Sequence, residues 1–305
     1  MVDMHIHTVY SDGTKTVKEV LKLCEEKNLE YISITDHNTC IQYKDEVLKE
    51  NIFSGKIIKG AEMNATFQNK NIEVLAYDIK NTEIIENWSQ KFFSEKILRK
   101  KQDEEKRKFL KICDSKGLIY DENKIKKNIS LTDYITIYIY YELIRHKENF
   151  NILGEEYVKS LNAFIRKELM NPESEFYVGI NNIPKPMYKD VIDIIHKAGG
   201  KAFLAHPFEY RFSNTIKFID KLREEKELDG IECFHPSSME DNKKEVLLDY
   251  ARYNKLYISG GSDFHGEKKP GIEIGTGSGN LHIQKDFIEE WVCDNYWKYI
   301  KNIAD

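Results

Sequence analysis

The sequence VDMHIHT at residues 2–8 combines a strand pattern with two side chains that bind metals. We predict a short strand here, in which His5 and His7 stand two residues apart. Because side chains alternate between the two faces of a strand, both imidazoles lie on the same face. Such a pair is a compact arrangement for a divalent metal, although two histidines alone indicate a site only weakly.

The alternation of strands and helices recurs in both outer segments of the chain. Residues 17–24 place apolar side chains at intervals of three and four, which predicts a helix with one buried stripe. Helices are also expected around residues 191–196 and 287–292. Further strands are expected at residues 31–35, 56–60, 72–77, 201–205, 230–234 and 256–259. This alternation predicts parallel strands joined by crossover helices.

The middle of the chain has long helical patterns and few strand signals. We therefore predict one α/β domain from residues 1–80 and 187–305, with residues 81–186 as a helical insertion that selects the substrate. Residues 95–108 carry 11 charged side chains in 14 positions. We interpret this run as a solvated helix face, with a surface for an acidic substrate or partner as the alternative. Residues 135–141 fit a strand or a helix, and we favour a helix.

Composition restricts the class of protein. The 305 residues include 46 Lys and Arg and 51 Asp and Glu, and the net charge of -5 argues against a basic nucleic-acid surface as the main feature. The 41% of hydrophobic residues excludes global disorder. Five cysteines without a CxxC are interpreted as reduced thiols. With no targeting segment and no apolar stretch of membrane-spanning length, we expect a cytoplasmic protein without membrane contact.

Histidines and carboxylates gather where the predicted strands end. Six of the nine histidines have this placement, namely His5, His7, His37, His206, His235 and His265. In a βα barrel, sites assemble at the rim formed by the carboxyl ends of the strands. Asp12, Glu62 and Asp263 add carboxylates to the same rim. Each residue alone has an ordinary structural explanation, but together these nitrogen and oxygen ligands suit Zn, Mn or Fe, as a hydrolase of anionic esters requires.

The order of these motifs resembles a known family. The motifs are DMHIHT at residues 3–8, SDG at 11–13, TDH at 35–37, GAE at 60–62, AHP at 205–207 and SDFH at 262–265. They are similar to those of the PHP (polymerase and histidinol phosphatase) family of metal-dependent phosphoesterases. The resemblance covers both outer segments of the chain. It implies a distorted (β/α)7 TIM-like barrel with a trinuclear metal site at the carboxyl rim.

The resemblance also implies which residues hold the ions. One ion would take His5, His7, Glu62 and Asp263, a second Glu62, Glu73 and His206, and a third Asp12, His37 and His265. Glu62, Asp263 and His206 are the residues expected to be catalytic. At Glu73 the family commonly has a histidine. A carboxylate there makes the ligand set harder in the sense of hard and soft ligands. The choice among Mn, Zn and Fe, and whether two or three sites fill, therefore stay open. A plain strand residue is the alternative for Glu73.

The substrate is harder to infer. Relatives that hydrolyse nucleoside bisphosphates carry an R-x-H pattern in the insertion, and residues 129–134 read ISLTDY instead. Arg211 is a candidate phosphate ligand, with a surface ion pair as its alternative. His235 is a candidate acid or substrate contact, with a strand-end cap as its alternative. Lys268 and Lys269 are further candidates at the rim, whereas Arg145 and His146 are expected to form a surface pair.

We therefore expect a metal-dependent phosphoesterase that hydrolyses a phosphomonoester of a small metabolite or nucleotide with a metal-bridging hydroxide. Its partner would be a small phosphorylated substrate, with no obligatory nucleic acid, and the oligomeric state stays open. The alternatives are a nuclease or phosphodiesterase on single-stranded nucleic acid, a histidinol-phosphate phosphatase and a non-catalytic metal-binding module.

Overall fold

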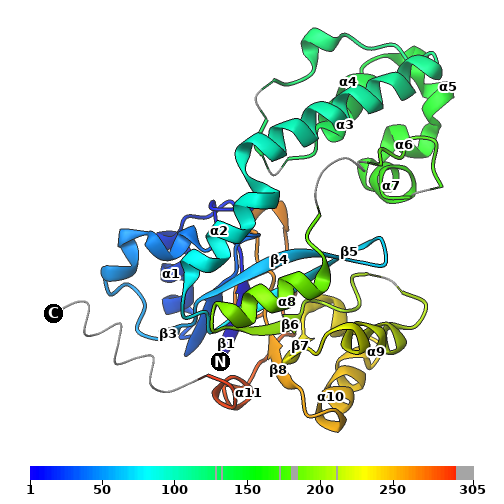
Figure 1. Ribbon diagram of the computed structural model, residues 1–305. Helices are drawn as coiled ribbons and strands as arrows, with labels where there is room; N and C mark the ends of the chain where they lie inside the picture. Colours follow the sequence, from blue (N-terminus) through cyan, green and yellow to red (C-terminus); the bar gives the residue numbers. More distant parts are fainter. Residues whose placement is uncertain (128, 132, 172, 180–184, 211, 293–305) are drawn as a thin grey trace. The chain divides into compact units, whose positions relative to one another are not determined.

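A computed structural model describes residues 1–292 of the chain, apart from residues 128, 132, 172, 180–184 and 211. The chain forms two compact units (Figure 1). The first unit contains Met1–Gln90 and Lys185–Asp305, and the second contains Lys91–Pro184. No helix in the described residues is both long enough and apolar enough to cross a membrane.

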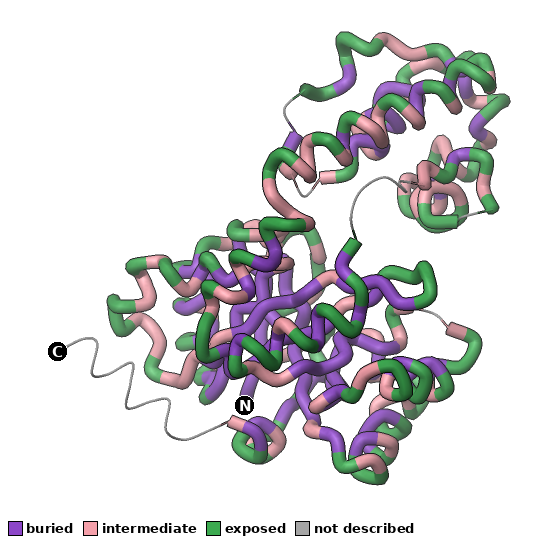
Figure 2. Tube along the Cα trace, viewed as in Figure 1, coloured by how far each residue is buried: buried purple, intermediate pink, exposed green. Residues whose placement is uncertain are grey.

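The first unit is built on two β-sheets, and its fold is of the α/β class. The first sheet has the order β1 (Val2–Ile6), β2 (Tyr31–Ile34), β3 (Lys56–Ile57), and all its strands are parallel. The second has the order β4 (Gly60–Phe67), β5 (Lys70–Tyr77), β6 (Lys201–Leu204), β7 (Gly230–Phe234), β8 (Tyr257–Gly260). Its last three strands are parallel, and their residues are buried apart from Lys201 and Tyr257, which begin β6 and β8 (Figure 2).

The expectation of parallel strands throughout is wrong at β4 and β5. These two strands form an antiparallel hairpin, and β5 also pairs antiparallel with β6. The hairpin turns at Gln68 and Asn69, whose φ angles of 48° and 62° lie in the left-handed region. Two consecutive residues of this kind suit the tight turns that match the twist of a hairpin. The hairpin brings Glu62 and Glu73 onto neighbouring strands.

The expected closed barrel is not confirmed, because the named strands of the described residues form two separate sheets. Two isolated parallel bridges lie at the ends of the sheets. One joins Ile6 to Phe264, which follows β8, and the other joins His37, which follows β2, to Glu62. The end of β1 therefore lies beside the segment after β8, and the segment after β2 lies beside the first half of β4, where Glu62 stands within the strand.

Helices and short helical turns accompany these sheets. The helices of the first unit are α1 (Val17–Glu26), α2 (Thr82–Phe93, which continues into the second unit), α8 (Tyr188–Lys197), α9 (Thr215–Glu225), α10 (Lys243–Tyr253) and α11 (Asp286–Glu289). Its 3-10 turns are η1 (Ile41–Lys44), η2 (Glu46–Lys49), η6 (Pro236–Ser238) and η7 (Gly266–Lys268). Helix α1 begins with a capping box, in which Thr16 and Glu19 satisfy each other's backbone N–H groups. Its buried stripe of Val17, Val20, Leu21 and Cys24 confirms the helix predicted from the apolar spacing.

The second unit is helical in its described residues. It contains α3 (Glu95–Ser115), α4 (Ile135–Leu143), α5 (Phe150–Leu153), α6 (Glu155–Lys159), α7 (Leu161–Phe164), the 3-10 turns η3 (Glu122–Lys124) and η4 (Lys147–Asn149), and the π-helix η5 (Ile165–Leu169). Helix α4 confirms the helical interpretation of residues 135–141. The core centres on Phe164, whose ring centroid lies 5.1 Å from Tyr140 and 5.3 Å from Phe176.

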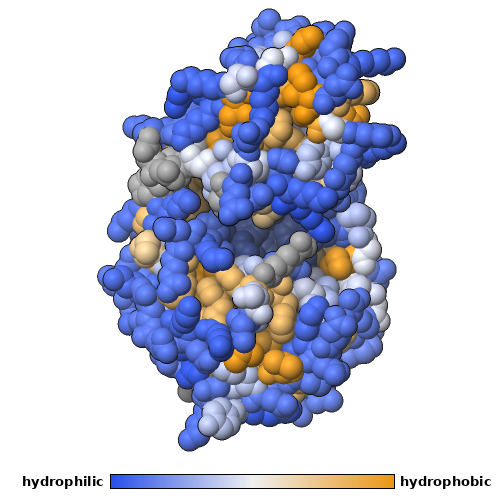
Figure 3. Space-filling model, turned by 90° about the vertical axis from the view of Figure 1, so that its right-hand side faces the viewer, coloured by the Kyte–Doolittle hydropathy of each residue, from blue (hydrophilic) through white to orange (hydrophobic). Residues whose placement is uncertain are grey.

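The charged run predicted at residues 95–108 falls on α3, where it forms ion pairs. Lys101 pairs with Glu105 and Lys108 with Glu104, one helical turn apart. On the face drawn in Figure 3 the surface is mostly hydrophilic, with hydrophobic residues in several groups. Met170 is among the large apolar side chains that are exposed, and some exposure of this kind is ordinary in a folded protein.

Candidate metal centre

Strand β1 supplies the first two side chains of the centre. His5 lies within β1 and His7 directly after it, and both are fully buried. Their Nε2 atoms are 3.1 Å apart, so the two imidazoles share one face as the strand alternation predicts. This arrangement requires close packing behind His5. A Cβ atom on Gly261 would come within 2.3 Å of the His5 backbone nitrogen, so only glycine fits there.

Two carboxylates complete a first cluster around these histidines. Glu62 Oε2 lies 3.2 Å from the Nε2 atoms of both His5 and His7. Asp263 Oδ1 lies 3.6 Å from His5 Nε2 and 3.4 Å from His7 Nε2. One ligand atom of each of the four residues lies within 4.8 Å of the others, close enough for a common ion. These four residues are the set assigned to one ion from the sequence.

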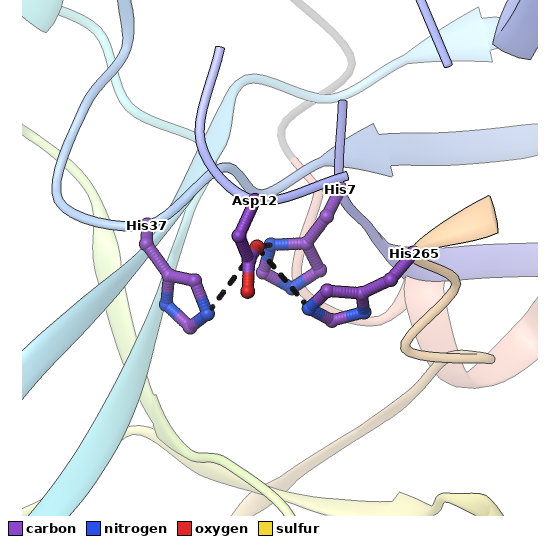
Figure 4. A group of neighbouring side chains, drawn as sticks. All are labelled: His7, Asp12, His37 and His265. Carbon is purple, nitrogen blue, oxygen red and sulfur yellow. Dashed lines mark ion pairs between the residues drawn. The ribbon is translucent and has the colours of Figure 1, made fainter. Parts of the chain in front are cut away.

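A second cluster gathers around Asp12 (Figure 4). Asp12 Oδ1 lies 3.2 Å from His265 Nε2, 3.7 Å from His37 Nε2 and 3.5 Å from His7 Nδ1. The three residues expected to share an ion, Asp12, His37 and His265, therefore lie together, and the structure adds His7 to them. His7 faces the first cluster with one ring nitrogen and the second cluster with the other.

The third cluster contains Glu73, the residue that departs from the family pattern. His206 Nε2 lies 2.8 Å from Glu62 Oε1 and 3.4 Å from Glu73 Oε2. His37 also belongs here, since its Nδ1 lies 3.2 Å from Glu62 Oε2 and 3.9 Å from Glu73 Oε1. The Asn64 side chain donates a hydrogen bond of 3.1 Å to Glu73 Oε1 and so orients that carboxylate.

Charge in the clusters is concentrated and strongly coupled. Burial raises the pKa of Glu62, but the imidazoles of His5 and His37 outweigh it and hold that pKa well below its usual range. Burial lowers the pKa of His7, but contacts with Asp263 and Glu62 outweigh it and raise it to about 9. Carboxylates that draw protons onto neighbouring imidazoles in this way carry negative charge that divalent cations can neutralise.

The available donors fit transition-metal ions. Imidazole nitrogens and carboxylate oxygens together are the donors that Zn, Mn and Fe accept. The buried Nδ1 atom of His37 has no hydrogen-bond partner among the described residues, although a carboxylate oxygen lies 3.2 Å away. A buried ring nitrogen is costly to leave unpaired, and a metal ion at this point removes that cost.

Further residues hold the proposed ligands in place. Glu232 Oε1 lies 2.9 Å from His5 Nδ1, and Glu232 Oε2 accepts a 2.7 Å hydrogen bond from the backbone N–H of His206. Carboxylates that bind the second nitrogen of a metal-ligating histidine fix the orientation of its ring. Sequence analysis did not single out Glu232 as a site residue. The available signal was an acidic residue within the apolar strand GIECF.

Asp36 holds the backbone beside the clusters in place. It accepts hydrogen bonds of 2.8 Å from the backbone N–H of Thr8 and 2.6 Å from the hydroxyl of Ser11. These bonds fix the loop that carries Asp12. The backbone of Asp263 is also constrained, since its φ of 55° is left-handed and costs about 1–3 kcal/mol in a residue with a side chain.

A pocket of about 370 Å³ opens onto the clusters. His235 lines it, with its Nε2 atom 3.3 Å from Asp263 Oδ2. Lys269 also lines it and donates a hydrogen bond to the same oxygen, so of the two rim lysines this one reaches the site. Arg211 lies outside the described residues. Arg145 and His146 both contact Glu142 in the second unit, as expected of a local pair.

Comparisons with known proteins agree with this geometry. The PHP domain pattern matches residues 3–258 of the chain. The chain is 23% identical to the 5'-3' exoribonuclease Rnm of Escherichia coli K12, over 90% of this chain and 87% of that protein. It is 24% identical to the 5'-3' exoribonuclease of Haemophilus influenzae, over 95% of this chain and 97% of that protein. These names contradict the expectation of a small phosphorylated substrate with no obligatory nucleic acid, which was wrong.

Solved structures show the same fold. A candidate metal-dependent phosphoesterase from Bifidobacterium adolescentis superimposes with a TM-score of 0.66 at 23% identity, over 95% of this chain and 94% of that chain. An amidohydrolase from Chromobacterium violaceum superimposes with a TM-score of 0.64 at 20% identity, over 90% of this chain and 89% of that chain. At these identities the likeness concerns the fold alone.

Proposed function

The chain belongs to the PHP domain family and is a metal-dependent phosphoesterase, and we propose that its substrate is RNA, which it degrades from the 5′ end towards the 3′ end. The observation that carries this proposal is the match to proteins named 5'-3' exoribonuclease over 90% or more of the chain. That match extends across the helical second unit as well as the unit with the metal-binding clusters. The match therefore includes the second unit, which we infer selects the substrate.

Two or three divalent ions, Mn, Zn or Fe, belong in the three clusters. Nine residues would hold them: His5, His7, Asp12, His37, Glu62, Glu73, His206, Asp263 and His265. When bound, such ions lower the pKa of a coordinated water and neutralise charge on the phosphate. A carboxylate at Glu73 adds an oxygen donor to the third cluster, which favours Mn or Fe over Zn at that position.

Three residues of the chain organise the reaction. Glu62 turns Oε1 towards His206 and Oε2 towards His5, so one carboxylate joins neighbouring ion positions. Asp263 turns Oδ1 towards the first cluster and Oδ2 towards His235, which orients the carboxylate. His206 lies between Glu62 and Glu73 and restricts both. His235, at the edge of the pocket, is placed to contact the substrate.

The test is a directional assay with Mn²⁺ and short RNAs labelled at the 3′ end. We expect stepwise shortening from the 5′ end, release of mononucleotides, and protection of RNA whose 5′ terminus is blocked. Asp263→Asn should abolish the activity, whereas Asp249→Asn, at a side chain 83% exposed in the same unit, should not. Stable RNA in the presence of protein that binds Mn²⁺ would contradict the proposal, and shortening from the 3′ end would contradict the direction.

A further inference from the structure

The pocket over the clusters is lined mainly by acidic residues and histidines. Its described lining includes five carboxylates, Asp12, Glu62, Glu73, Glu209 and Asp263. Lys269 is the one lysine or arginine in that described lining. The histidines of the lining lie against the carboxylates of the clusters, as His206 lies against Glu62. Among the described lining residues, Lys269 is therefore the side chain that offers phosphate an ammonium group.

Contacts of Lys269 place its ammonium group on the substrate side of Asp263. Its Nζ donates to Asp263 Oδ2, the oxygen that also faces His235 Nε2 at 3.3 Å. The other oxygen, Oδ1, faces the histidines of the first cluster, 3.4 Å from His7 Nε2. Lys269 thus leaves the metal-facing oxygen of Asp263 untouched.

The Lys269 side chain is also more exposed than that of Asp263, as expected if it lies on the substrate side. The Asp263 side chain is 8% exposed, whereas that of Lys269 is 43% exposed. An ammonium group has three N–H donors, and the described residues provide a hydrogen-bond acceptor for one of them. Because Lys269 lines the pocket, the remaining two donors are available there for charge-assisted hydrogen bonds to phosphate oxygens.

We propose that Lys269 binds a non-bridging oxygen of the RNA phosphate that enters the pocket. The inference rests on the proposed function, since it names the residue by which that site recognises its substrate. The ion pair with Asp263 holds the lysine at the pocket before RNA arrives. The contact is to a phosphate and not to a base, so it carries no sequence preference.

The competing explanation is that Lys269 only orients Asp263. The two roles separate in Lys269→Gln and Lys269→Arg, with Lys268→Gln as the matched control because Lys268 is the exposed neighbouring lysine. The measurements are Mn²⁺ affinity by titration calorimetry, affinity for a short unmodified RNA as a function of salt, measured by rapid mixing before cleavage, and KM and kcat on RNA.

A phosphate contact predicts that Lys269→Gln weakens RNA binding by about 10-fold or more. The affinity for Mn²⁺ should change by a smaller factor than the affinity for RNA. Loss of one phosphate contact should also lower the slope of log K against log salt by about 0.7, the value for a single strand. Lys269→Arg should restore most of the binding and of the slope, because the guanidinium group keeps the charge.

The opposite pattern would overturn the inference. If Lys269→Gln weakens Mn²⁺ binding and lowers kcat while KM and the salt slope stay unchanged, the residue positions Asp263 and does not touch RNA. An unchanged RNA affinity and slope in Lys269→Gln would likewise reject the contact. Failure of the proposed function is distinguishable, since the wild-type protein would then neither bind nor shorten RNA, whatever residue stands at 269.

Discussion

In the first unit, His5, His7 and Glu62 are at most 1% exposed and lie against one another, whereas the buried core of the second unit centres on aromatic residues such as Phe109 and Phe164. Charges of the second unit form ion pairs near its surface, as on α3. Burying charged groups is costly unless they are paired or bound to metal. The first unit therefore gathers several buried charges at a cost that folding alone does not require, whereas the buried Glu142 of the second unit is paired with Arg145 and His146.

The largest effect should come from the carboxylate at the centre of the first unit. Glu62→Gln removes a charge shared by the first and third clusters, and we expect a loss of activity on the order of 10⁴-fold, since metal ions supply several kcal/mol to such reactions. The temperature of thermal unfolding should change little in comparison, because the substitution also removes a buried charge. Activity assays and thermal unfolding with and without Mn²⁺ test this. Retained activity would contradict the view that the buried charges of the first unit serve the reaction.

A core substitution in the second unit should give the reverse result. Phe164→Ala removes a fully buried ring that packs against Phe109, Tyr140 and Phe176, and should destabilise the second unit by about 3–5 kcal/mol. Hydrogen exchange should show the loss of protection in α3 and α4, while Mn²⁺ affinity stays that of the wild-type protein. A parallel loss of Mn²⁺ affinity would show that the clusters depend on the helical core.

A smaller effect is expected from the carboxylate behind His5. Glu232→Gln keeps the size of the side chain but removes the charge that orients His5 and contacts His206, which should weaken metal binding by about 10- to 100-fold. Calorimetric titration with Mn²⁺ measures this. Glu240→Gln in the same unit is the control, and equal affinities for the two variants would exclude an orienting role.

The smallest effect is expected at the surface of the second unit. Lys106→Gln breaks the 2.7 Å ion pair with Glu122, in which the two side chains are 29% and 60% exposed. Exposed pairs of this kind contribute about 0.2–1 kcal/mol. Chemical denaturation followed by circular dichroism should therefore show a change of this size, and a larger loss would mean that surface charge supports the second unit more than its aromatic core suggests.

Sequence patterns were sufficient where the physics is local. The spacing of apolar residues predicted α1, and strand alternation predicted that His5 and His7 share a face. The same reasoning missed the hairpin of β4 and β5, because its turn uses Gln68 and Asn69, which lack the glycine that usually marks such turns. The missed hairpin matters for the site, since it sets Glu73 beside Glu62.

The amino-acid order was enough to show which side chains end strands, and hence that histidines and carboxylates would gather at one rim. It could not show which of them meet. Glu232 contacts His5 across 227 residues of sequence, and His206 meets Glu62 across 144. Such distances depend on strand register and on the packing of several elements at once, and no local pattern encodes them. For this reason the ligand types and the candidate rim lysines could be inferred from the chain alone, whereas the orienting carboxylate Glu232, and which of the two lysines reaches Asp263, emerged only from the tertiary structure.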